Sequence, residues 1–283
     1  MIKLFLIKLF LIKLFLIKLF FKKFIKLILF VLFVIRNKMK FVHKPTGIMG
    51  TKIAEMYKNK LGKNKVCICG KLDPMAQGKL LLLFDEDCKK MDENLDHQKT
   101  YQFKIAWGFQ TDSDDTLGLI TEEKKIDELK IKELVNNMEK YIEKYEGCYN
   151  QYFHKYSART VHNENGEKHP LWEWTNLDRL DEIEIPYKQV SVNYIKYYHT
   201  EKKNMELLKK EIMENMKNIE GNFRQDAIRE QWKNYDKKKE VWISTFEAHV
   251  STGYYIRQLI HTLGVETGLL GMAIDINRTY IHI

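Results

Sequence analysis

The feature that most constrains this chain is a nine-residue segment, residues 70–78, that lies between two short apolar runs. The runs cover residues 66–70 and 79–84, and their length and composition are typical of strands in a sheet. Asp73 precedes Pro74, which excludes the helical region for the aspartate backbone, and a glycine at each end allows positive φ or a close approach of the backbone. The sequence therefore predicts a rigid loop that joins two strands and holds one carboxylate in place. An Asp-Pro turn is common in proteins, so the loop alone does not identify a catalytic residue.

Two further segments have the pattern of strands. Aromatic or aliphatic residues occupy every second position from Tyr101 to Trp107, and less apolar residues stand between them. This period of two predicts a strand with one buried face. Residues 246–250 predict another strand by the same criteria.

Helices are predicted in three places, two of them from periodicity. Apolar residues recur at steps of three and four in residues 131–145 and again in residues 255–263, which predicts amphipathic helices closed by Gly147 and Gly264. The charged stretch at about residues 200–240 is poor in β-forming residues and predicts a helical insertion between two strands. Strands scattered among helices without a strict β-α-β rhythm predict an α+β fold, with a mixed, largely antiparallel central sheet flanked by helices.

The first forty residues differ in charge from the rest of the chain. Residues 1–40 carry ten Lys or Arg and no acidic residue, and the first acidic residue is Glu55. Because the whole chain has a formal charge of +9, the residues after position 40 carry −1. Bulk charge therefore does not support RNA binding, and any basic surface on the body of the protein must be local.

A five-residue unit repeats four times in residues 1–20, and an apolar run follows at residues 27–35. Each unit turns a helix by about 140°, so the repeated lysines spiral around the axis and form no amphipathic face. The apolar run is too short for a bilayer, which needs about 20 residues. The alternatives are a signal anchor or organelle leader, a membrane-touching tail, and a repeat expansion without function. We favour the last, exclude residues 1–38 from the fold, and expect no membrane contact through residues 1–35.

The cysteines indicate neither a zinc site nor a disulfide framework. Cys67, Cys69, Cys88 and Cys148 form no CxxC pair and have no histidines at zinc spacing. They predict a reduced, intracellular protein without a structural metal. Cys67 and Cys69 alternate with apolar residues, so we expect them to be buried thiols of a strand.

Several motifs, in order along the chain, resemble those of the TruB pseudouridine synthases. Residues 70–78 resemble the signature loop of that family, G-x-L-D-P-x-A-x-G, whose aspartate is catalytic. The other matching segments are Lys44-Pro45-x-Gly47; Lys99-x-Tyr101 with Gly108, Thr111-Asp112-Ser113-x-Asp115 and Gly118; Gln151 with Tyr156-Ser157-Ala158; Ser251-x-Gly253-x-Tyr255-Ile256-Arg257; and Gly268, Gly271, Ala273 and Arg278-Thr279. Asn222-Phe223-Arg224, with Trp232 beyond it, resembles an insertion of the eukaryotic stand-alone members. The similarity covers about residues 41–283, and it implies a pseudouridine-synthase-like catalytic domain at residues 39–283.

The resemblance implies an enzyme that flips a uridine out of structured RNA and isomerises it to pseudouridine. Asp73 matches the catalytic aspartate, with attack at the sugar or at the base left open. Arg257 matches the arginine that pairs with this carboxylate, and its guanidinium fork would orient Asp73 and keep it ionised. Tyr101 matches the tyrosine that stacks on the flipped base and takes part in removing the C5 proton. Tyr101 also fits a core position beside Phe103, so both roles stay open.

Further positions follow from the same resemblance. Tyr255 would line the substrate pocket, although it also fits the apolar stripe of a helix. Lys44 and Pro45 would support the loop that carries the aspartate, and Gly70 and Gly78 would let its backbone approach the substrate. No cofactor and no metal are expected. The implied partner is the T-arm stem-loop of tRNA, bound by a monomer inside the cell, with the cytoplasm favoured and an organelle left open.

The match departs from the family pattern in a few places. Ile68 stands where a histidine that orders the bound RNA loop is usual, and the two prolines expected near Phe153-His154 are missing. The chain ends soon after Thr279, so no RNA-binding domain of the PUA type is expected after the catalytic domain. This favours a stand-alone enzyme for the T-arm uridine at tRNA position 55. The alternative is an RNA-binding or tRNA-folding protein that has the same fold and no catalytic activity.

Overall fold

The computed structural model describes residues 18, 20–26, 39–236 and 238–283. Most of the segment that we excluded from the fold, residues 1–17, 19 and 27–38, lies outside the described residues. Among the residues that are described, no helix is both long and apolar enough to cross a membrane.

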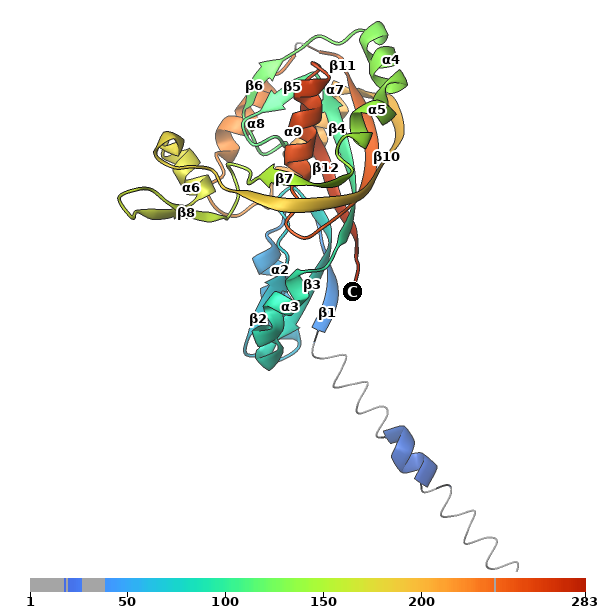
Figure 1. Ribbon diagram of the computed structural model, residues 1–283, viewed down its shortest axis with the longest axis vertical. Helices are drawn as coiled ribbons and strands as arrows, with labels where there is room; N and C mark the ends of the chain where they lie inside the picture. Colours follow the sequence, from blue (N-terminus) through green and yellow to red (C-terminus); the bar gives the residue numbers. More distant parts are fainter. Residues whose placement is uncertain (1–17, 19, 27–38, 237) are drawn as a thin grey trace, which may run out of the picture.

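A strongly twisted eight-stranded sheet organises the described part of the chain (Figure 1). Seven strands follow the order β1-β3-β12-β4-β11-β10-β7, and β2 pairs with β3 outside this path. Neighbouring strands are antiparallel except β3 and β12, which pair in parallel through two residues of each strand. The sheet strands are β1 (Met39–Lys44), β2 (Val66–Cys69), β3 (Gln77–Phe84), β4 (Lys99–Trp107), β7 (Gly147–Tyr152), β10 (Tyr187–Asn204), β11 (Glu240–Val250) and β12 (Gly271–Ile281). The predicted α+β class with a largely antiparallel sheet is therefore confirmed.

Helices cover both faces of the sheet. On one face, α4 (Glu128–Asn136), α5 (Met138–Glu143) and α9 (Ile256–Glu266) pack on the buried side chains of β4, β10 and β11. On the other face, α7 (Met205–Met216) and α8 (Gln225–Lys233) share a second cluster with residues of β4, β11 and β12. In Figure 1, α2 (Gly50–Lys60) and α3 (Met91–Leu95) lie beside β1, β2 and β3 at the lower end. The other short elements are η1 (Asp85–Lys90), β5 (Phe109–Thr111), β6 (Ile120–Glu123), β8 (Thr160–His162), β9 (Lys168–Pro170), α6 (Leu171–Asn176) and η2 (Leu180–Glu182).

The alternation in β4 predicts its buried face well, except near its end. Phe103 and Ile105 are fully buried under α9, while Gln102 on the opposite face is exposed. Ala106 points away from α9 and is nevertheless buried. The reason is the second cluster, in which Trp232 of α8 and its neighbours cover this end of the strand. The strand therefore has two covered faces where the helical segment between β10 and β11 lies on it.

Two glycines predicted to close helices have other roles. The helix predicted at residues 131–145 is divided at Asn137, whose amide Nδ2 donates to the carbonyl of Glu133 (2.9 Å) and ends α4. Gly147 then begins strand β7. Gly264 lies inside α9, where a Cβ would stand 2.5 Å from the backbone nitrogen of Gly271. Close packing of α9 on the chain before β12 requires glycine there, and the left-handed residue after the helix is Gly268 (φ +65°).

The charged stretch near residues 200–240 is only partly helical. Strand β10 runs through its first residues to Asn204, and there it pairs with β11 as a two-stranded ribbon. Lys202 is part of this ribbon, and its ammonium lies 4.7 Å from the ring centroid of Trp242 across the pair. Backbone pairing with β11 thus overrides the weak β preference of the lysines and glutamates. Helices α7 and α8 occupy the rest of the stretch.

Candidate active site

The loop that carries Asp73 joins β2 to β3, as the sequence predicts, and both of its glycines have positive φ. Gly70 has φ +83° and Gly78 has φ +115°. A Cβ on Gly78 would lie 2.4 Å from the carbonyl oxygen of Arg278, because β12 pairs with β3 at this point. A Cβ on Gly70 would lie 3.5 Å from a guanidinium nitrogen of the same arginine. The packing of Arg278 thus requires glycine at position 78, whereas Gly70 is favoured by its positive φ, and a contact of either with substrate stays a prediction.

The side chain of Lys44 supports the Asp-Pro turn from the interior of the protein. Its ammonium is completely buried and donates hydrogen bonds to the carbonyls of Pro45 (3.2 Å), Pro74 (3.0 Å) and Ala76 (2.5 Å). Burial lowers the pKa of Lys44 to about 8, with the carboxylate of Asp73 acting in the opposite direction. Two of the three carbonyls, those of Pro74 and Ala76, follow Asp73 in the loop. These contacts are those of a support for the loop, which is the role that the sequence predicts for Lys44 and Pro45.

Arg257 and Asp73 are 184 residues apart in sequence and in direct contact in the fold. Arg257 is the second residue of α9, and its Nε donates to Oδ2 of Asp73 at 2.8 Å. The guanidinium is almost fully buried, with its side chain 4% exposed, whereas the side chain of Asp73 is 38% exposed. The carboxylate therefore has one side fixed by a buried cation and another side open. The predicted pairing is present, but it uses the single Nε and not the two-pronged fork.

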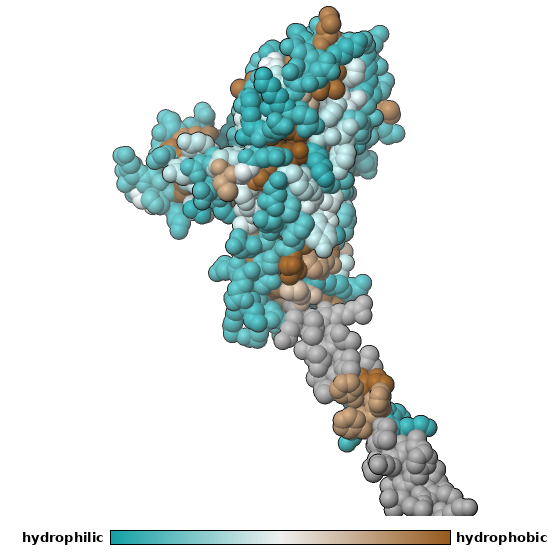
Figure 2. Space-filling view, turned by 45° about the vertical axis from the view of Figure 1, so that its right-hand side comes forward, coloured by the Kyte–Doolittle hydropathy of each residue, from teal (hydrophilic) through white to brown (hydrophobic). Residues whose placement is uncertain are grey.

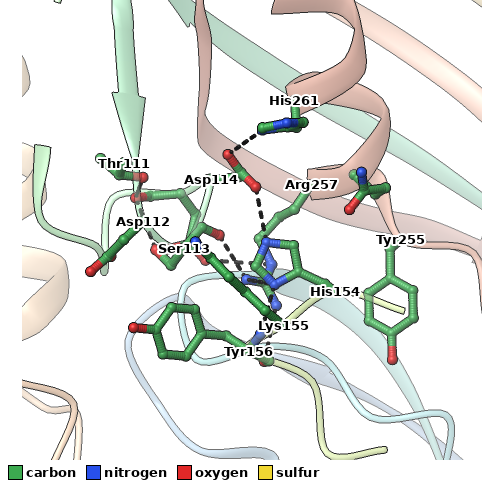
Figure 3. Close-up of polar contacts among 12 residues, drawn as sticks. Thr111, Asp112, Ser113, Asp114, His154, Lys155, Tyr156, Tyr255, Arg257 and His261 are labelled. Carbon is green, nitrogen blue, oxygen red and sulfur yellow. Dashed lines mark hydrogen bonds and ion pairs between the residues drawn. The ribbon is translucent and has the colours of Figure 1, made fainter. Parts of the chain in front are cut away.

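The rest of the guanidinium is directed at other partners (Figure 3). Its Nη1 donates to the carbonyl of Ser113 (2.7 Å) and lies 3.2 Å from Nδ1 of His154. The carboxylate of Asp115 stands 3.7 Å from Nε. Burial raises the pKa of Asp115, and the charge of Arg257 opposes this rise. Burial alone would lower the pKa of Arg257, but the charges of Asp73 and Asp115 raise it, so the guanidinium is held in its charged form.

A hollow beside Asp73 is lined by residues from three parts of the chain. The lining includes Asp73, Met75 and Ala76 of the loop, Asp115 and Thr116, and residues 273–276 of β12. The two carboxylates at its edge, of Asp73 and Asp115, both face Arg257. The hollow has a volume of about 10 Å³, room for about one water molecule, so it marks the open side of the Asp73 carboxylate and is too small to hold a base.

The two tyrosines predicted at the site lie in different surroundings. Tyr101 is 7% exposed in the core under α9, and its hydroxyl is 3.5 Å from Nη1 of Arg278. Neither Tyr101 nor Tyr255 is among the residues that line the hollow beside Asp73. Tyr255 immediately precedes α9, and Gln151 fixes its backbone through both its N–H (2.8 Å) and its carbonyl (3.1 Å). Burial raises the pKa of Tyr255. The fold thus brings Tyr255 next to Arg257, whereas the role of Tyr101 as a core residue or a substrate contact stays open.

Sequence reasoning missed two buried basic residues around the loop. Arg278 is 1% exposed and donates to the carbonyls of Gly70 (2.8 Å) and Lys79 (2.7 Å), so it joins the two ends of the loop region. Lys99 is 4% exposed, and burial followed by the charge of Arg278 lowers its pKa to about 8. Both belong to quoted motifs, but nothing in the sequence indicates that their side chains turn inward.

Histidines and acidic residues next to Arg257 form a further cluster that the sequence did not single out. Asp114 receives hydrogen bonds from His154 and His261, both at 3.0 Å. Burial alone would raise the pKa of Asp114, but these two histidines lower it to about 2. The one available signal was that His154 occupies a place where the resembled motif has proline.

No group of three or more His, Cys, Asp or Glu is placed to hold a metal ion within the described ranges. Of the two strand cysteines, Cys69 is buried and Cys67 is half-buried. Burial raises the pKa of both thiols.

Several basic residues are close in sequence to residues of the site. Lys71 is exposed two residues before Asp73, and Lys155 follows His154. The guanidinium of Arg159 lies 5.1 Å from the ring centroid of Phe153, which in turn packs on Tyr255 at 5.8 Å. Figure 2 shows a largely hydrophilic face on which apolar side chains appear in small separate areas. These residues are local basic groups on a body that has almost no net charge.

Comparison with known protein families matches residues 58–215 to the TruB family pseudouridylate synthases (N-terminal domain). A tRNA pseudouridine synthase B from Rickettsia akari is 28% identical over 246 residues, which cover 86% of this chain and 66% of that protein. A protein of the same name from Aquifex aeolicus is 34% identical over 97 residues, 34% of each chain. This chain thus spans somewhat less than two thirds of the Rickettsia relative.

Among solved structures, a chain in a Cbf5-Nop10-Gar1 complex superimposes with a TM-score of 0.50 and 17% identity. The superposition covers 87% of this chain and 49% of the other. At this identity the likeness concerns the fold alone, and it confirms the predicted pseudouridine-synthase-like architecture.

Proposed function

Because the chain belongs to the TruB family of pseudouridylate synthases, we propose that it isomerises a uridine of the tRNA T-arm, at tRNA position 55, to pseudouridine with Asp73 as the catalytic carboxylate. The membership confirms the resemblance that the ordered motifs predict. The substrate, the position and the catalytic residues are the proposal.

The observation that carries the proposal is the contact between Arg257 Nε and Asp73 Oδ2 at 2.8 Å. A buried guanidinium fixes one oxygen of a carboxylate whose side chain is 38% exposed at the edge of a hollow. A charged pair of this kind is expensive to bury and is therefore informative when it faces an opening. The Asp-Pro turn, Lys44 and Arg278 all hold the loop from the protein side. Asp73 is thus oriented before any substrate binds, which is what a single catalytic carboxylate requires.

The reaction converts one isomer into another. The bond between C1′ of the ribose and N1 of the uracil breaks, the base turns, and a new bond forms between C1′ and C5. C5 loses its hydrogen as a proton, and N1 gains one, so no oxidant or reductant is consumed. Asp73 would act as the nucleophile or as the anion that stabilises the detached ribose. Tyr255, beside Arg257, would line the space for the extruded base, and Tyr101 is the second candidate for that contact.

Local basic groups support an RNA substrate. Lys71 and Lys155 are close in sequence to Asp73 and His154, Arg159 is exposed, and the ammonium of Lys188 donates to the carbonyl of Thr252 in the loop before α9 (3.0 Å). Phosphate contacts of this kind position RNA without reading its sequence. The target would be a structured loop, because the everted nucleotide must be presented on a stem. We assign the protein to the inside of the cell, with the cytoplasm as its compartment, and to a monomer.

The test is tritium release from 5-tritiated uridine in a T-arm transcript. The protein is expected to release tritium and to form pseudouridine at position 55, and Asp73→Asn is expected to release none. Affinity of Asp73→Asn for the transcript should stay within about tenfold of the unaltered protein, because binding rests on many contacts. Turnover by Asp73→Asn would refute the role of Asp73. Binding without release by the unaltered protein would favour the non-catalytic alternative.

A further inference from the structure

The side of Arg257 that faces away from Asp73 contacts a buried histidine. We propose that His154 is a positioning residue, an uncharged hydrogen-bond acceptor that fixes the guanidinium of Arg257 and, through it, the carboxylate of Asp73. This inference rests on the proposed function and adds a residue to its machinery. His154 stands where the resembled motif carries proline, and a proline side chain can accept no hydrogen bond.

The hydrogen bonds of His154 determine which ring nitrogen carries the proton. The backbone N–H of Tyr156 donates to Nδ1 at 3.0 Å, so Nδ1 must be unprotonated. Nη1 of Arg257, also a donor, lies 3.2 Å from the same nitrogen. The proton is therefore on Nε2, which lies 3.0 Å from Oδ2 of Asp114 and donates to it. The imidazole therefore accepts hydrogen bonds at Nδ1, which faces Arg257, and donates one from Nε2 to Asp114.

Without this acceptor, the guanidinium has a competing partner. Nη1 of Arg257 is held by the Ser113 carbonyl and His154, while Nη2 has only a long contact of 3.5 Å to the carbonyl of Tyr156. Asp115 stands 3.7 Å from Nε, just beyond hydrogen-bond distance. Without His154, Nη1 would keep only the Ser113 carbonyl, and a small rotation of the guanidinium about that contact would bring Nε to Asp115 and draw it away from Asp73. The contacts at Nη1 oppose that rotation.

A closed circuit of hydrogen bonds anchors His154 itself (Figure 3). The circuit runs from Arg257 to His154, from His154 to Asp114, and from Asp114 to His261, whose Nδ1 lies 3.0 Å from Oδ1. His261 is one helical turn after Arg257, so the circuit begins and ends on α9. Asp114 has φ +58°, a left-handed conformation that is costly for a non-glycine residue and directs its carboxylate between the two histidines.

Burial and the charge of Arg257 keep His154 neutral. Burial, followed by the charge of Arg257, lowers the pKa of His154 to about 4, while Asp114 and Asp73 act in the opposite direction. An imidazolium at this position would place a second cation against Arg257 and remove the acceptor. At neutral pH the ring is therefore in the form that the contact with Arg257 requires.

Two variants separate the two sides of the imidazole. In His154→Asn, the amide oxygen can take the place of Nδ1 and receive from Tyr156 and Arg257, while the contact with Asp114 is lost. In His154→Gln, the amide can reach Asp114, but nothing replaces Nδ1. The single-turnover rate of tritium release, the affinity for the T-arm transcript, and the free energy of unfolding in urea are measured for both.

The inference predicts a rate for His154→Asn within about threefold of the unaltered protein, and a loss of about 10- to 100-fold for His154→Gln, the range for one hydrogen bond to a charged group. Affinity should change by less than about threefold in both, because His154 contacts Arg257 and not the RNA. A purely structural role would instead make the rate follow the free energy of unfolding. Equal rates in the two variants, or a rate that follows stability alone, would overturn the inference.

His261→Ala is the matched control. It removes the hydrogen bond between Nδ1 of His261 and Asp114 and leaves both contacts of Nδ1 of His154 in place, so a loss smaller than that of His154→Gln is expected. A loss of rate as large as that of His154→Gln would mean that Asp114, and not His154, positions Arg257, and the inference would be wrong. If the unaltered protein releases no tritium, the proposed function fails and this inference fails with it. If it is active and His154→Gln is as fast, only the inference fails.

Discussion

Acidification should destabilise this protein through His154. The unfolded chain takes up a proton on this imidazole near its ordinary pKa of 6.5, whereas in the folded protein burial and Arg257 lower the pKa to about 4. Between these values the unfolded state binds more protons, so the free energy of unfolding falls as the pH falls. With these two pKa values, linkage gives a loss of about 2 kcal/mol between pH 7 and pH 5 from this residue alone. That is a large share of the stability of an ordinary domain.

The measurement is urea unfolding, followed by tryptophan fluorescence at a series of pH values from 7 to 5. Other groups titrate in this range, so the quantity of interest is the difference between the unaltered protein and His154→Asn. The variant lacks the titrating imidazole, and its free energy of unfolding should fall by about 2 kcal/mol less over the same interval. Equal pH dependence in the two proteins would show that His154 is not a buried neutral base, and the electrostatic part of the reasoning would be refuted.

His261 provides a control of opposite sign. Its hydrogen bond to Asp114 raises its pKa above the ordinary value. The folded protein therefore binds this proton more tightly than the unfolded chain, and the stability from His261 is complete at low pH and lost as the pH rises through the raised pKa. Removing it in His261→Asn should make the loss of stability on acidification steeper, whereas removing His154 should make it shallower.

Two further predictions concern packing. Gly264→Ala in α9 should lower the free energy of unfolding in urea by about 2 kcal/mol, because its Cβ would lie 2.5 Å from the backbone of Gly271. The control is Gly50→Ala, where the nearest atoms are at 3.6 Å and the change should be neutral or stabilising by up to about 1 kcal/mol. Equal effects at the two sites would contradict the packing described for Gly264. Trp232→Ala should cost about 3–5 kcal/mol, since this side chain is fully buried in the cluster that covers the second face of the sheet. A cost below 1 kcal/mol, measured in the same way, would mean that α8 is not packed on the sheet as described.

Local sequence was sufficient for much of the framework. The Asp-Pro loop between two strands, the buried face of β4 and the helix that begins next to Arg257 all follow from patterns within about ten residues. Such patterns report which groups must be buried and where the backbone must turn, and both are local properties. The pattern was misleading where long-range packing overrides it, as at Gly264 and in the charged part of β10.

The pairing of Asp73 with Arg257 was predicted from the resemblance of the ordered motifs to those of a known family. Nothing in the sequence itself shows that the two side chains meet. Whether two residues 184 positions apart meet at 2.8 Å depends on how α9 lies on the sheet. The same is true of Arg278, which reaches the loop only because β12 pairs with β3 in parallel at Gly78. The sequence shows these residues as basic, and only the fold shows that they are buried and what they contact.

The division between the two sources of information has a physical cause. Composition and short-range order determined that this chain forms an α+β domain with one rigid carboxylate-bearing turn, because helix and strand periodicity and the Asp-Pro backbone restriction act over a few residues. Only the tertiary structure decided that His154 is a neutral acceptor on Arg257, because its protonation depends on burial and on charges brought from three distant segments. Electrostatic environments of this kind are properties of the packed molecule.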